Sequence, residues 1–117
     1  MAMTPEKKVK EKVKALCKRY GAYYAMPVMQ GMANNGTPDI LVGHAGHFAG
    51  VEVKAGSNKP TKLQLARLLE IRRAGCTALV INERNLGLLE KWLAAPRWTL
   101  DNLNEYLPAE QKNPGPT

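Results

Sequence analysis

The chain has 117 residues and a mass of 12.9 kDa, which suits one domain and is too short for two. Hydrophobic residues make up 44% and charged residues 23%, a composition that excludes a disordered protein. No apolar stretch is long enough to cross a membrane, and the charged N-terminus is followed by no apolar segment of a secretory signal. We therefore expect a cytoplasmic domain over residues 1–107 and a disordered tail over residues 108–117. Cys17 and Cys76 lie in amphipathic or apolar segments and are expected to be buried thiols.

The positive charge is concentrated in two segments of the chain. Seventeen Lys and Arg against ten Asp and Glu give a net charge of +7. Residues 1–20 hold seven basic and two acidic groups (+5), residues 60–75 hold four and one (+3), and residues 76–117 hold four and five (−1). This asymmetry favours a polyanionic partner such as nucleic acid, and a merely solvated helix face is the alternative.

A helix is predicted from Thr4-Pro5 to Tyr20, ending at Gly21, because apolar residues recur at helical spacing. Residues 22–29 favour a strand with an edge or bend at Pro27, and residues 30–36 favour a loop. The remaining segments are predicted from apolar runs and their turn residues. They are strands over 39–42 and 47–54 joined by a turn, a helix over 60–74, a strand over 76–81, a helix over 85–94 and a short helix within 99–107.

This order predicts an α/β fold, α-β-β-β-α-β, with a mixed central sheet flanked by helices. The strand over 76–81 follows a crossover helix, so we expect it to run parallel to the strand over 47–54.

Two acidic residues are predicted to meet at one end of the hairpin. If the turn centres between Ala45 and Gly46, residues pair when their numbers sum to 91, which sets Asp39 opposite Glu52. Their Cβ atoms would then lie roughly 5 Å apart. Like charges in that position repel unless one is protonated or a cation bridges them, and carboxylate oxygens suit Mg²⁺ or Mn²⁺.

The first helix offers a third carboxylate. At about 100° per residue, Glu6 projects into the sector of the apolar stripe, whereas Glu11 points to solvent. Glu6 is therefore a candidate to share the cation. An N-terminal Glu that is simply favoured by the helix dipole remains the alternative.

Three further residues are candidates, each with a plainer alternative. Lys54 would position an attacking water and offset charge on a phosphate, or would form only a salt bridge. Gln64 would orient the water or a phosphate, or would lie on the surface. Gly36 would allow close approach of a DNA backbone, or would serve only a turn. His44 and His47 form an H-x-x-H pair but have no further zinc ligand at the right spacing, so they are interpreted as turn residues.

These motifs together resemble the VRR-NUC family of the PD-(D/E)XK, restriction-endonuclease-like superfamily. The resemblance covers residues 4–82 and rests on four stretches, read in order as Gly36-Thr-Pro-Asp39, Glu52-Val-Lys54, Pro60-Thr-Lys-Leu-Gln64 and Arg73-Ala-Gly75.

The resemblance implies a Mg²⁺- or Mn²⁺-dependent DNA endonuclease with no small-molecule cofactor. Asp39, Glu52 and the Val53 carbonyl would hold the metal and Glu6 would assist, while Lys54 and Gln64 would act on the water and phosphate. Family members of this length are viral or bacterial and resemble Holliday-junction resolvases, which implies a homodimer acting on branched DNA, in a bacterial host cytoplasm if phage-encoded. The residues expected to contact DNA are Lys7, Lys10, Lys14, Gly36, Lys59 and Lys62.

Two other functions stay open. One is a catalytically inactive nucleic-acid-binding module of the same fold, although the joint presence of Asp39, Glu52 and Lys54 speaks against it. The other is a structural protein whose acidic and basic hairpin residues form only a ladder of salt bridges.

The orientation of the first helix is testable. We expect Glu6→Gln to reduce nuclease turnover more than Glu11→Gln does, because only Glu6 lies on the side of the helix that faces the protein. Initial rates of DNA cleavage at saturating Mg²⁺ compare the two variants. A larger loss in Glu11→Gln would contradict the helical-face assignment.

Overall fold

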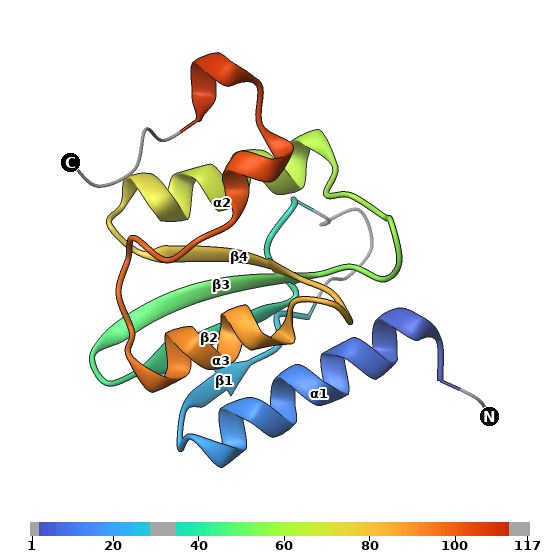
Figure 1. The fold of residues 1–117 in the computed structure, drawn as a ribbon, viewed down its shortest axis with the longest axis vertical. Helices are drawn as coiled ribbons and strands as arrows, with labels where there is room; N and C mark the ends of the chain where they lie inside the picture. The colour runs from blue at the N-terminus through green and yellow to red at the C-terminus, as the bar shows by residue number, and fades with distance from the viewer. Residues whose placement is uncertain (1–2, 29–34, 113–117) are drawn as a thin grey trace.

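The computed structural model describes residues 3–28 and 35–112 and contains one four-stranded sheet with helices on both faces (Figure 1). The strand order β1-β2-β3-β4 follows the sequence. Helices α1 and α3 cover one face, and α2 with the C-terminal 3₁₀ turns covers the other (Figure 1). The predicted order of elements and the mixed sheet are confirmed.

Helix α1 (Pro5–Arg19) begins and ends where the sequence predicts. The Thr4 hydroxyl accepts a hydrogen bond from the Lys7 N–H at 3.2 Å, and Gly21 takes a positive φ of 73° after the last turn. Val9, Val13 and Cys17 are buried against the sheet, as their helical spacing predicts. Both cysteine thiols are free; Cys17 is buried as predicted, whereas the prediction was wrong for Cys76, which is only partly buried because it lies between the end of α2 and the start of β4.

Strands β2 (Ile40–His44) and β3 (His47–Val53) form the predicted hairpin in the predicted register. Ile40 pairs with Val51 and His44 with His47, so paired residue numbers sum to 91. Strand β2 continues two residues beyond its predicted end at residue 42. The turn therefore contains only Ala45 and Gly46, and both have a positive φ. Strand β1 (Tyr23–Ala25) pairs antiparallel with β2 and forms one edge of the sheet, whereas most of the predicted loop lies outside the described residues.

Helix α2 (Lys62–Arg73) and strand β4 (Thr77–Ile81) complete a crossover, and β4 lies parallel to β3 as predicted. The helix starts two residues after the predicted Pro60. A capping box causes this shift, since the Thr61 hydroxyl accepts from the Gln64 N–H while the Gln64 Oε1 accepts from the Thr61 N–H at 2.8 Å.

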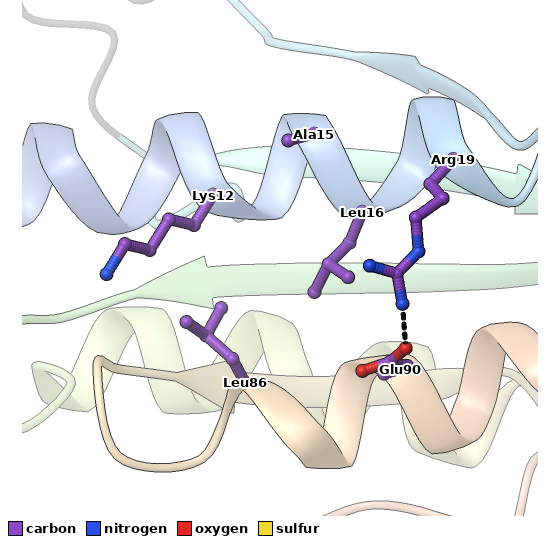
Figure 2. A pocket seen from close by; sticks show the side chains of 6 residues that line it. All are labelled: Lys12, Ala15, Leu16, Arg19, Leu86 and Glu90. Atoms are coloured by element: carbon purple, nitrogen blue, oxygen red, sulfur yellow. Dashed lines mark hydrogen bonds and ion pairs between the residues drawn. The ribbon is translucent and has the colours of Figure 1, made fainter.

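Helix α3 (Leu86–Ala94) packs beside α1, and Trp92 is fully buried in the core beneath them. Figure 2 shows the hollow between the two helices, about 320 Å³ in volume, where Arg19 forms an ion pair with Glu90. The Tyr20 hydroxyl donates to the same carboxylate at 2.9 Å. These contacts fix the C-terminal end of α1 on α3.

The C-terminal segment covers the free edge of β4. The side-chain amide of Asn102 accepts from the Val80 N–H at 2.9 Å and donates to the Val80 carbonyl at 2.8 Å, as a neighbouring strand would. The predicted helix within 99–107 is a shorter 3₁₀ turn, Leu103–Tyr106. A second 3₁₀ turn, Ala109–Gln111, corrects the predicted start of the disordered tail, because the Gln111 carbonyl accepts from the guanidinium of Arg72.

Nowhere in the described ranges does a helix combine the length and the apolar character that a membrane crossing requires.

The close packing of Gly36 against α2, just before β2, can be tested by substitution. Its φ is +82°, and a Cβ there would lie 2.7 Å from the Leu63 carbonyl oxygen of α2. We expect Gly36→Ala to lower the free energy of unfolding by roughly 2–4 kcal/mol, because strain from the positive φ adds to a collision with backbone.

Gly21→Ala is the matched control, since Gly21 also has a positive φ but has nothing within 4 Å of the added Cβ. It should cost about 1 kcal/mol. Urea unfolding curves measure both values, and equal losses would contradict the close approach of Gly36 to α2.

Candidate active site

Asp39 stands immediately before β2 and is fixed to the end of β3. Its Oδ2 accepts a hydrogen bond from the Val53 N–H at 2.8 Å. This side-chain bond joins the start of β2 to the end of β3, beyond the last backbone pairing of the hairpin. This contact leaves Oδ1 as the oxygen directed to the remaining polar groups of the site. Asp39 therefore lies beside Glu52, as the register predicts.

Glu52 is a carboxyl group buried within β3. It is 1% exposed, and within the described residues its Oε1 has no hydrogen-bond partner. Burial raises the pKa of Glu52 to about 8, with the neighbouring Asp39 carboxylate adding to the rise and Lys54 opposing it. The negative charge of Glu6 raises it slightly further, so Glu6 also acts on this carboxyl.

Lys54 follows β3 directly and turns its ammonium back to the site. Its Nζ lies 3.7 Å from the Glu52 Oε2, and its side chain is only 14% exposed. The next segment is held from both sides: the Gly56 N–H donates to Glu83 and the Gly56 carbonyl accepts from Arg84, each at 2.8 Å. No motif in the sequence indicates these two residues, Glu83 and Arg84, which follow β4 and restrain the segment beyond Lys54.

Lys10 belongs to the site as well as to the basic face of α1. Its Nζ lies 3.6 Å from the Asp39 Oδ1 and 3.8 Å from the Glu6 Oε2. Glu6 is therefore at the rim of the site, where Lys10 links it to Asp39. The predicted contrast in exposure between Glu6 and Glu11 is not found, because their side chains are 43% and 46% exposed. Glu11 instead pairs with Lys14 at 2.7 Å.

Gln64 and Gly36 both have structural roles in the fold, in addition to the roles toward DNA that their sequence motifs predict. The Gln64 Oε1 is engaged in the α2 capping box, so a role toward water or phosphate falls to its amide nitrogen. Gly36 lets the chain pass against the backbone of Leu63. This packing brings the first turn of α2 beside the segment that leads to Asp39. The roles of Gln64 and Gly36 toward DNA stay predictions.

The basic residues divide into two groups. Lys7 and Lys14 line a hollow of about 330 Å³ beside Glu6, Lys10 and Met26. Lys59, on the segment between Lys54 and α2, and Lys62, the first residue of α2, are exposed. In contrast, Arg72 is largely buried and pairs with Asp101 at 3.5 Å, and Arg67 pairs with Glu70. Part of the charge over 60–75 therefore holds the fold together and is not available to a polyanion.

The donor set of Asp39 and Glu52 suits a hard divalent cation. Two carboxylates meet here, and the buried Oε1 of Glu52 lacks a partner that such a cation would supply. The main-chain carbonyl of Val53, between Glu52 and Lys54, is a further oxygen donor of the right class. Over 3–28 and 35–112, no three His, Cys, Asp or Glu side chains gather into a metal cluster, so Glu6 as a ligand stays a prediction.

The two histidines lie at the opposite end of the hairpin from Asp39 and Glu52. His44 and His47 flank the hairpin turn, as expected, and the His44 ring lies 6.4 Å from that of Trp92. The hollow in Figure 2 contains a single carboxylate, Glu90, which is already paired with Arg19. Neither place offers the paired carboxylates that metal-assisted chemistry needs.

Solved structures of other proteins share this arrangement of helices and strands. One, described as a VRR_NUC domain, superposes with a TM-score of 0.63 and 22% identity, over 80% of this chain and 99% of that chain. The fold is that of a VRR_NUC domain. Hjc of Archaeoglobus fulgidus, a Holliday junction resolvase from an archaeal hyperthermophile, superposes with a TM-score of 0.53 and 18% identity, over 65% of this chain and 66% of that chain.

No protein-family model matches the sequence, and no curated protein matches it significantly. The likeness to the VRR_NUC domain is therefore one of backbone arrangement. It confirms the restriction-endonuclease-like fold that the sequence motifs predict. In the VRR_NUC fold of this chain, Asp39, Glu52 and Lys54 lie together at one end of the β2–β3 hairpin.

The raised pKa of Glu52 makes folding stability depend on pH. The folded state holds the Glu52 proton more tightly than the unfolded chain, whose value is near 4.5. This stabilisation is complete below pH 4.5 and is lost as the pH rises to about 8. In metal-free buffer we expect the free energy of unfolding to fall by roughly 2–4 kcal/mol more in the wild type than in Glu52→Gln between pH 5 and pH 8.

Urea titrations at several pH values measure this difference. Glu11→Gln is the control, because the pKa of exposed Glu11 is lowered and its titration lies below this pH range. Parallel pH profiles for wild type and Glu52→Gln would show that Glu52 is ionised in the folded protein at pH 5.

Proposed function

We propose that this protein is a divalent-metal-dependent DNA endonuclease, with branched DNA as its preferred substrate. One observation carries the proposal: a buried carboxyl, Glu52, with an unpartnered oxygen lies beside Asp39 and within 3.7 Å of the Lys54 ammonium. These three side chains lie in a chain with the fold of a VRR_NUC domain, which supports the proposal. A pair of acids and one base in a rigid hairpin suits hydrolysis of a phosphodiester.

Each residue has a part in the chemistry. Asp39, Glu52 and the Val53 carbonyl would hold Mg²⁺ or Mn²⁺, which when bound supplies Lewis-acid polarisation of the phosphate and acidifies water. The Lys54 ammonium donates a hydrogen bond to the attacking water and offsets charge that develops on the phosphate. Its low exposure of 14% reduces screening by solvent and strengthens that interaction.

The exposed lysines would bind the DNA backbone. Lys7 and Lys14 lie on the α1 side of the acidic pair, and Lys59 and Lys62 lie on the segment that follows Lys54. Phosphates bound on both sides would direct a scissile bond toward Asp39 and Glu52.

Branched DNA as substrate is supported by the likeness of the fold to a Holliday junction resolvase. Symmetric cutting of two strands requires two active sites related by a two-fold axis, so we propose that the working form is a homodimer. Sedimentation at several protein concentrations measures that assembly.

Cleavage of end-labelled DNA tests the proposed function. A four-way junction, a flap and a linear duplex are each incubated with Mg²⁺, Mn²⁺ or chelator. We expect cutting only with metal and fastest on the junction, with Asp39→Asn and Glu52→Gln inactive. Lys54→Ala should lower turnover by about a hundredfold or more while DNA affinity changes little.

Lys91→Ala, an exposed lysine on α3, is the control and should retain wild-type cleavage. A junction that is bound but not cut under any condition would favour the inactive nucleic-acid-binding module. Metal-dependent cutting that survives in Lys54→Ala would remove Lys54 from the chemistry.

A further inference from the structure

Lys10 has an unusual position for a residue expected to contact DNA. Its ammonium lies 3.6 Å from the Asp39 Oδ1, and its side chain is three-quarters buried. The other oxygen of Asp39, Oδ2, is taken by the Val53 N–H at 2.8 Å. Lys10 therefore contacts the Asp39 oxygen that does not accept this backbone hydrogen bond, where a cation bound to the carboxylate would also lie.

We propose that Lys10 is the built-in counter-cation of Asp39 and competes with the divalent metal for that carboxylate. A divalent cation held by Asp39 and Glu52 would repel an ammonium at this distance, because like charges this close interact strongly even in a polar medium. Binding of the metal to Asp39 would then displace the Lys10 ammonium from this carboxylate.

Release of Lys10 has a consequence for substrate binding. Lys10 lines the same hollow as Lys7 and Lys14, on the side of α1 proposed to bind DNA. An ammonium that no longer neutralises Asp39 is available to a phosphate in that hollow. Metal binding would therefore increase the affinity for DNA through Lys10, and DNA would increase the affinity for metal by the same factor. This inference rests on the proposed function, since it assumes that Asp39 binds the cation.

Calorimetric titration with Ca²⁺, without DNA, tests the competition. We expect Lys10→Met to bind Ca²⁺ about thirtyfold more tightly than the wild type, the effect of removing one unit charge about 4 Å from a divalent cation in a medium as polar as water. Lys14→Met is the matched control, because Lys14 lines the same hollow but pairs with Glu11 and not with Asp39. Its Ca²⁺ affinity should equal that of the wild type.

The coupling is measured with a labelled four-way junction, bound with and without Ca²⁺. Lys14→Met should weaken junction binding by the same factor in both conditions. Lys10→Met should weaken it in Ca²⁺ and leave it nearly unchanged in chelator, because only the metal makes Lys10 available. Unchanged or weaker Ca²⁺ binding by Lys10→Met would overturn the competition, as would equal losses of junction affinity in Ca²⁺ and chelator.

The inference and the proposed function can fail separately. Wild-type protein that cuts DNA with Mg²⁺, together with unaltered Ca²⁺ binding in Lys10→Met, would overturn the inference alone. Tighter Ca²⁺ binding in Lys10→Met without any DNA cleavage would overturn the nuclease alone. Ca²⁺ binding that persists in Asp39→Asn, or no Ca²⁺ binding by any variant, would overturn the metal site on which both depend.

Discussion

The register of the β2–β3 hairpin forces two carboxyl groups together at its open end, and the rest of the site responds to that constraint. Asp39 accepts the Val53 N–H, and Glu52 is buried next to it with one oxygen unpartnered. Burial and the charge of Asp39 together hold the pKa of Glu52 near 8. Such a pair stores electrostatic free energy that a proton, an ammonium or a divalent cation can release. Two ammonium groups approach this pair, that of Lys54 directly after β3 and that of Lys10 on α1.

The surrounding elements hold this hairpin end in place. Glu83 and Arg84 fix the N–H and the carbonyl of Gly56 beyond Lys54, and the close packing of Gly36 on α2 fixes the approach to Asp39. These contacts involve backbone atoms, which restricts the positions of the functional side chains more than surface ion pairs would. A rigid surround of this kind would hold the proposed catalytic groups in position before a substrate binds.

The basic residues that give the chain its net charge of +7 have different roles in the structure. Arg72 binds the C-terminal segment to α2, and Arg19 joins α1 to α3. Lys10 pairs with Asp39, and the lysines around it face the hollow along α1. The surface proposed to bind a polyanion is thus narrower than the charge distribution along the sequence suggests, and it lies next to the carboxylates.

Local patterns in the sequence determined the helices and strands of this fold, and they also determined that Asp39 lies beside Glu52. Helical spacing, the capping residue Thr4 and the two-residue turn act over short distances, and a hairpin register follows from its turn alone. The boundaries that differed, at the start of α2 and in the C-terminal segment, depended on side chains such as Gln64 and Asn102 binding backbone groups. The tertiary structure alone decided that Lys10 reaches Asp39, because the two residues are 29 positions apart and no periodicity in the sequence reports how α1 is placed against the end of the sheet.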